Sequence, residues 1–193
     1  MSMLERITGQ ERLKRALAIL LSASFRLGQH LPPLLFSGPS GTGKTKMATE
    51  VAATYEGTKT ISIDCSGEDI EDILAKMVDV GALDTVFLDE LHHLKNRAQD
   101  RLLPVLNYLR APKKAPDAIK VRGAEMKIPP VNFIAATDRP AKLIKPIRTR
   151  LRQFVLQPYS VPELEQMAVQ FARRQQVLLL RGARRVLASA CLG

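Results

Sequence analysis

Residues 38–45 read GPSGTGKT, and this segment constrains the fold of the 193-residue chain more than any other. Its spacing is that of a phosphate-binding loop, whose glycines let backbone N–H groups and one lysine surround nucleotide phosphates. The loop follows an apolar run beginning at Leu34 and precedes the helical segment KMATEVAATY, which is the strand–loop–helix order that the mechanism requires. We therefore predict that nucleotide is bound by Gly38, Pro39, Ser40, Gly41, Thr42, Gly43, Lys44 and Thr45.

A second motif, TVFLDE at residues 85–90, predicts an apolar strand that delivers two carboxylates at its end. Asp89 is suited to hold Mg²⁺ through water, with Thr45 supplying a hydroxyl, and Glu90 is suited to polarise the attacking water. The pair favours hydrolysis of ATP to ADP, although an ordinary strand end with an exposed acidic turn remains open. For His92 and His93 we predict packing or surface roles, because no third metal ligand is evident.

The chain alternates short apolar runs with helical periodicity, which predicts an α/β fold with a doubly wound, parallel five-stranded sheet flanked by helices. The expected strands cover residues 34–38, 61–64, 85–90, 132–137 and 152–157, and the expected helices 10–27, 46–55, 67–78 and 96–110. Ser66 and Asp69 resemble a capping box for the third of these helices, and Pro104 is expected to bend the fourth or move its start. Residues 111–130 are interpreted as a projecting hairpin.

After residue 157 the pattern becomes wholly helical, with Ser160 as a cap and Pro162 in the first turn. We therefore expect an α/β domain over residues 1–157 and the incomplete beginning of a helical domain over 158–193.

The formal charge of +10 is concentrated near the C-terminus. Residues 1–138 hold 18 basic and 17 acidic side chains, whereas residues 139–193 hold 11 basic and 2 acidic ones. Such a segment can face nucleic acid phosphates, or it can be a solvated face or a subunit contact. No apolar run approaches the roughly 18 residues that span a bilayer, so no membrane insertion is expected. Cys65 and Cys191 lie far apart in the sequence, so we expect them to be reduced structural thiols of a cytoplasmic protein.

Four further segments, ITGQERLKRAL, DELHHL, IPPVNFIAATDRP and KPIRTRLRQF, occur in an order that resembles the AAA+ superfamily. Within it the chain is most similar to the RuvB family of Holliday-junction branch-migration motors. The resemblance implies ATP or ADP with Mg²⁺ as ligands, a homo-oligomeric and hexameric ring, and DNA as a partner. It also implies three roles: adenine-side contacts by Ile7, Thr8 and Gly9, sensing of the γ-phosphate by Thr137, and an arginine finger, Arg150, that acts on a neighbouring subunit.

Some features depart from that family. Arg148 and Arg152 flank Arg150, so the finger could shift by two residues, and an arginine cluster that only solvates a strand end also remains open. The hairpin lies where the resemblance implies binding of the RuvA partner, but its basic, alanine-rich residues leave the partner protein undecided. The RGARR segment at Arg181 follows the start of the helical domain at residue 158 too soon to hold the arginine that the family places there, the sensor-2 arginine. By family spacing, that arginine and a winged-helix domain are expected beyond Gly193, as in a truncated or naturally minimal protein.

Our leading hypothesis is an ATP-driven helicase or translocase subunit acting in DNA recombination and repair. A clamp-loader or initiator-like ATPase switch is the alternative. A protein-remodelling unit is disfavoured, because CSGEDIEDI lacks the aromatic residue of such pore loops. A binding module without turnover stays open, since the sensor-2 arginine is not found.

Overall fold

The computed structural model describes residues 3–111 and 118–190. Its centre is a parallel five-stranded sheet with the order β2-β3-β6-β1-β7, which confirms the predicted fold class. The strands are β1 (Leu34–Ser37), β2 (Thr60–Asp64), β3 (Thr85–Asp89), β6 (Asn132–Thr137) and β7 (Arg152–Val155). The last strand is two residues shorter than predicted.

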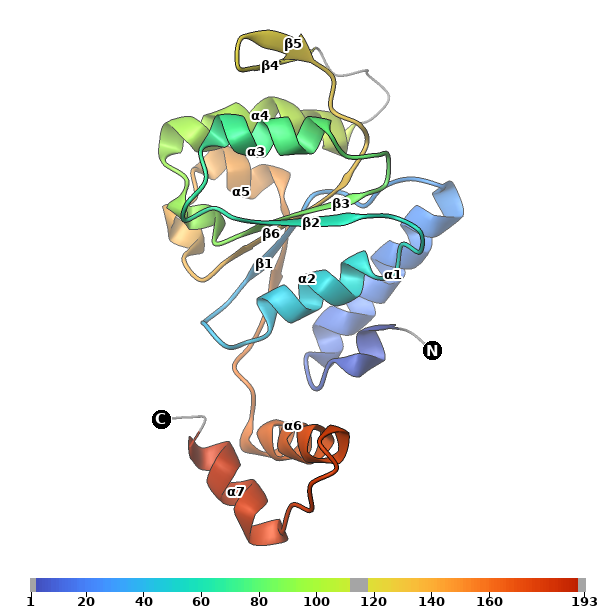
Figure 1. Ribbon diagram of the computed structural model, residues 1–193, viewed down its shortest axis with the longest axis vertical. Coiled ribbons are helices and arrows are strands. Elements are labelled where there is room, and N and C mark those ends of the chain that lie inside the picture. The colour runs from blue at the N-terminus through green and yellow to red at the C-terminus, as the bar shows by residue number, and fades with distance from the viewer. Residues whose placement is uncertain (1–2, 112–117, 191–193) are drawn as a thin grey trace.

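Helices cover both faces of the sheet (Figure 1). One face carries α1 (Glu11–Leu27) and α2 (Lys44–Ala52), and the other carries α3 (Ile70–Val78), α4 (Asn96–Arg110) and α5 (Lys145–Arg150). Because side chains alternate along a strand, the three central strands β1, β3 and β6 each contribute to two cores. On β1, Leu34 and Phe36 join the core with α1 and α2, whereas Leu35 joins the core with α3, α4 and α5. The short helix η1 (Met3–Arg6) precedes α1, η2 (Leu91–His93) lies between β3 and α4, and η3 (Pro140–Lys142) lies between β6 and α5.

In the α3/α4 layer, the predicted cap of α3 is wrong and the predicted bounds of α4 are confirmed. Ser66 does not cap α3, which begins at Ile70; the cap is Asp69, whose carboxylate accepts from the Glu71 N–H at 3.1 Å. Asp69 has the extended backbone of an N-cap, and its carboxylate reaches the second amide of the helix. Pro104 leaves the start of α4 at Asn96, so the helix keeps its predicted bounds despite one missing N–H.

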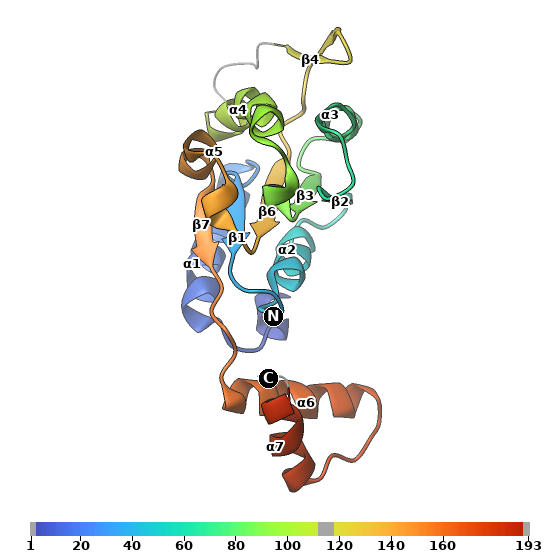
Figure 2. The ribbon, with the colours of Figure 1, turned by 90° about the vertical axis from the view of Figure 1, so that its left-hand side faces the viewer.

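The predicted hairpin is formed by β4 (Ile119–Val121) and β5 (Ala124–Met126), while residues 112–117 lie outside the described residues. Arg122 and Gly123 both have positive φ, at 49° and 84°, as a tight type I′ turn requires. Ile119 and Val121 are buried against α3 and α4, so the apolar side of the hairpin is used within the chain. Figures 1 and 2 show the hairpin at the opposite end of the molecule from the two C-terminal helices.

The C-terminal helices α6 (Val161–Arg174) and α7 (Arg181–Ala190) pack together below the sheet (Figure 2). Ser160 precedes α6 as predicted. The Glu163 carboxylate accepts from the Ser160 backbone N–H and from its hydroxyl, both at 2.7 Å, which completes a capping box. These bonds lower the pKa of Glu163.

The basic C-terminal residues occupy two separate regions of the described chain. One group lies between Arg139 and Arg152, around η3 and α5, and the other lies on α6 and α7. Figure 1 shows α5 beside the sheet and α6 and α7 beyond its lower end, so the two groups lie apart. No helix among the described residues combines the length and apolarity needed to cross a membrane.

Candidate nucleotide-binding site

The strand order brings the predicted motifs to one edge of the sheet. β6 lies between β1 and β3, and the register pairs Ser37 with Thr137 and Leu88 with Ala135. All these strands are parallel, so the segments that follow their carboxyl ends meet at the same edge. The phosphate-binding loop after β1, Asp89 at the end of β3 and Thr137 at the end of β6 are therefore neighbours.

The loop between β1 and α2 depends on its glycines. The glycines at 38, 41 and 43 have φ values of 151°, 77° and 88°, which residues with a Cβ atom rarely adopt. A Cβ on Gly38 would lie 2.5 Å from the backbone oxygen of Leu156, so this position also allows a close chain crossing. The loop opens into α2 at Lys44, and the N–H groups of that first helical turn are available to an anion.

Lys44 is the strongest electrostatic feature of the loop. The residue is 6% exposed, and its Nζ donates to the carbonyl oxygens of Gly38 and Pro39, both at 3.0 Å. Within residues 3–111 and 118–190, Lys44 makes no salt bridge with a carboxylate. A buried ammonium group without a counter-charge is costly, and a bound phosphate would supply that charge.

Thr45 and Asp89 form the part of the site that fits a hard cation. The Thr45 hydroxyl donates to Asp89 Oδ2 at 2.9 Å, so a hydroxyl and a carboxylate from α2 and β3 converge. The second oxygen, Asp89 Oδ1, accepts from the Glu90 N–H at 2.9 Å and is thereby oriented. Mg²⁺ prefers oxygen ligands of this kind, together with water and phosphate. These two side chains would hold Mg²⁺ beside the phosphate groups.

Glu90 follows β3 in a left-handed backbone conformation, with φ 50° and ψ 44°. This conformation is uncommon for a residue with a side chain and is often found at functional sites. Glu90, His92 and His93 each offer a potential ligand atom within 4.8 Å of the others. The expectation that the histidines have no third candidate ligand is thus corrected, because Glu90 is close to both. Two imidazoles are nevertheless a poor match to Mg²⁺, which Thr45 and Asp89 suit better.

Thr137 ends β6 and is fully buried. Its Oγ1 accepts from the Arg139 N–H at 3.0 Å and lies 3.1 Å from His92 Nδ1. Burial and the neighbouring His93 lower the pKa of His92. The lowered pKa favours the neutral form of the His92 ring, which connects the end of β6 with the segment after β3.

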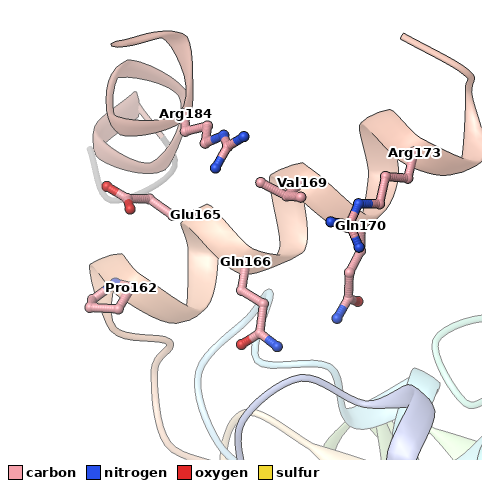
Figure 3. Close-up of a pocket in the computed structure, with 7 residues that line it drawn as sticks. All are labelled: Pro162, Glu165, Gln166, Val169, Gln170, Arg173 and Arg184. Atoms are coloured by element: carbon pink, nitrogen blue, oxygen red, sulfur yellow. The ribbon is translucent and has the colours of Figure 1, made fainter. Parts of the chain in front are cut away.

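The three residues proposed for the adenine side lie where the N-terminal segment meets α6. Ile7 is 5% exposed and belongs to the core beneath α2. The Thr8 hydroxyl donates to Gln170 Oε1 at 3.3 Å, and a Cβ on Gly9 would lie 2.2 Å from Glu163 Oε1. Figure 3 shows Gln166 and Gln170 projecting from α6 toward the N-terminal segments.

Tyr159 and Glu163 are contacts of the site that sequence reasoning missed. A Cβ on Gly43 would lie 2.8 Å from the Tyr159 hydroxyl, so this aromatic ring covers the end of the phosphate-binding loop. Burial raises the pKa of Tyr159. The only sequence signal was an aromatic residue just before the capping box of α6, which does not itself indicate a contact with Gly43.

Arg150 lies away from the phosphate-binding loop of its own chain. It ends α5, where its Nε donates to Asn107 and its Nη1 donates to the Pro146 oxygen at 3.0 Å. Arg152 is in register with Leu34, at the amino end of β1, whereas the loop follows Ser37 at the carboxyl end. The structure thus unites Lys44, Thr45, Asp89, Glu90 and Thr137 but leaves Arg150 outside this group.

Comparison with known proteins agrees with this arrangement. A sequence model described as "Holliday junction DNA helicase RuvB P-loop domain" matches residues 1–156. The RuvB subunit of the Holliday junction branch migration complex from Parasynechococcus marenigrum is 31% identical over 186 residues, covering 96% of this chain and 53% of that protein. A Thermotoga maritima RuvB mutant structure has a TM-score of 0.84 and 25% identity, covering 97% of this chain and 59% of that one. The chain spans about half the length of the curated relatives it matches.

Proposed function

Because the chain belongs to the family of RuvB P-loop domains, we propose that it is an ATP-hydrolysing motor domain of an oligomeric ring that moves DNA. The observation that carries this proposal is the buried Lys44, which makes no ion pair among the described residues and sits beside the Thr45–Asp89 pair. A nucleotide phosphate with Mg²⁺ would satisfy both the ammonium group and the two oxygen ligands at once. The curated relatives are subunits of a Holliday junction branch migration complex, and we extend that activity to this chain as part of the proposal.

In the proposed reaction, Lys44 and the loop N–H groups hold the β- and γ-phosphates. Thr45 and Asp89 would hold Mg²⁺, with Asp89 acting through water, and the bound ion would supply positive charge beside the phosphates. Glu90 orients the water that attacks the γ-phosphate, while the Thr137 hydroxyl contacts the transferred group. All of these groups lie at the carboxyl edge of the sheet.

Two further groups complete the proposed site. Tyr159 lies over the loop and joins Ile7, Thr8 and Gly9 on the adenine side, where residues 158–193 begin the helical lid that follows domain 1–157. Arg150 acts on the nucleotide of the next subunit, which makes a homo-oligomeric ring, a hexamer in our proposal, necessary for turnover. The hairpin over residues 111–130 is our proposed site for a partner protein, and the complex works in the cytoplasm.

DNA-stimulated turnover tests the motor function. Duplex and four-way junction DNA should each raise the rate of Mg²⁺-ATP hydrolysis, and the junction should change its arm lengths in a strand-exchange gel assay. DNA binding should weaken as salt rises from 50 to 200 mM, because Lys and Arg contacts release counter-ions from phosphates. Stimulation that requires only a protein partner, with no junction movement, would favour a clamp-loader or initiator-like switch instead.

A further inference from the structure

His92 Nδ1 is surrounded by three oxygen atoms from three side chains. Thr137 Oγ1 and Glu90 Oε2 each lie 3.1 Å away, and Asp138 Oδ1 lies 3.4 Å away. The His92 side chain is only 3% exposed, so water has little access to the ring. One ring nitrogen therefore faces the proposed sensor of the γ-phosphate, the proposed catalytic carboxylate and a second carboxylate.

The three surrounding oxygen atoms indicate which ring nitrogen of His92 carries a proton. A nitrogen lone pair directed at two carboxylates would be repelled, whereas an N–H is attracted by every oxygen in the group. The neutral ring must therefore carry its proton on Nδ1. A single N–H directs itself well at only one acceptor, and the hydrogen-bond geometry favours Thr137 Oγ1.

This assignment leaves one oxygen atom of each neighbouring carboxylate without a hydrogen bond from the described residues. Glu90 Oε2 and Asp138 Oδ1 are buried atoms without a hydrogen-bond partner among the described residues. Thr137 Oγ1, in contrast, receives N–H groups from both His92 and Arg139, so its own hydroxyl hydrogen is left to donate elsewhere. The arrangement keeps Glu90 free to accept a proton from water and keeps the Thr137 hydroxyl as a donor for a phosphate oxygen.

We propose that His92 is a positioning residue for hydrolysis: its Nδ1–H holds Thr137 and leaves the neighbouring Glu90 carboxylate unpaired for the attacking water. This inference rests on the proposed ATPase function and deepens it. The Nδ1 atom is the essential feature, rather than the size or aromatic character of the ring. His92 makes no contact with Lys44 or Thr45 in the described hydrogen-bond network, so nucleotide binding should not depend on it.

Two substitutions separate the two ring nitrogens. In His92→Asn, the side-chain amide N–H can take the place of Nδ1, whereas in His92→Gln the amide reaches the position of Nε2. His92→Phe keeps the ring and removes both nitrogens. We expect kcat for Mg²⁺-ATP hydrolysis to fall about 10- to 100-fold in the Phe and Gln variants and to recover to within about 5-fold of wild type in the Asn variant. KM and the Kd for ADP should stay within about 2-fold of wild type in all three, because Lys44 is untouched.

Measurements on the full chain, with thermal unfolding of each variant as a control, decide the matter. Wild-type kcat in the Phe variant would overturn the proposal, as would equal loss in Asn and Gln accompanied by weaker ADP binding, which is the pattern of a merely structural residue. If wild type itself hydrolyses ATP no faster than Glu90→Gln, the proposed ATPase function fails first. If wild type is active and the His92 variants have the same kcat as wild type, the positioning role alone fails.

Discussion

Removing the Arg150 guanidinium should stop ATP hydrolysis in a way that another subunit can repair. Three residue steps of β1 separate the level of Arg152 from Ser37, about 10 Å before the phosphate-binding loop begins. Arg150 precedes Arg152 and is tied to Asn107, so it cannot serve the loop of its own chain in this conformation. A guanidinium delivered to the transition state by a neighbour contributes about 10³-fold or more in rate, which is the loss expected for Arg150→Ala.

Mixing two inactive variants tests whether the contribution comes from a neighbour. Lys44→Ala lacks a working phosphate-binding loop but retains Arg150, and Arg150→Ala has the opposite defect. In a ring assembled at random from equal amounts, about one quarter of the interfaces would pair an intact loop with an intact arginine, so about one quarter of wild-type activity should return. The assay is steady-state phosphate release as a function of mixing ratio.

Substitutions of the neighbouring arginines control for register. Arg148→Ala and Arg152→Ala, mixed with Lys44→Ala in the same way, should already be active alone and show no comparable gain. If activity is restored with one of these variants, and not with Arg150→Ala, the arginine finger is Arg148 or Arg152 instead of Arg150. Full activity of Arg150→Ala alone, or no restoration in any mixture of folded and assembled proteins, would refute the reasoning.

Two further predictions concern the loop and the buried thiol. Gly38→Ala should destabilise the fold by about 1–3 kcal/mol more than Gly41→Ala in urea unfolding, because both residues have positive φ but only a Cβ at Gly38 meets the Leu156 oxygen; equal losses would contradict this. Burial raises the pKa of Cys65 to about 12. In a Cys191→Ser background at pH 8, the native thiol should therefore react with iodoacetamide about 10³-fold more slowly than the unfolded thiol, and comparable rates would show that Cys65 is accessible.

Much of the fold was predictable because its signals are local. The three central strands β1, β3 and β6 are short, mostly apolar runs, and Gly28, with φ 58°, ends α1 near the predicted residue. The positions of Asp89 and Thr137 next to the loop follow from parallel strands whose carboxyl ends share one edge. Residues that lie at the ends of buried strands were therefore placed near one another without knowledge of their contacts.

Contacts between distant segments were not predictable in the same way. Nothing local indicates that Tyr159 covers Gly43 or that Glu163 approaches Gly9, because both depend on where α6 packs. The three oxygens around His92 come from the residue before η2, from the end of β6 and from the turn after β6, so the sequence showed a pair of histidines but not their partners. Ser66 was the wrong cap because several polar residues precede α3, and only the backbone angles of Asp69 decide among them.

The central claim is that this chain hydrolyses ATP with Glu90 as the residue that orients water. The most direct measurement is the rate of phosphate release from Mg²⁺-ATP by wild type and by Glu90→Gln, together with the ADP affinity of both. We predict that the glutamine variant binds ADP as tightly as wild type and hydrolyses ATP at least about 10²-fold more slowly. Background hydrolysis by folded, assembled wild type that Glu90→Gln leaves unchanged would contradict the account.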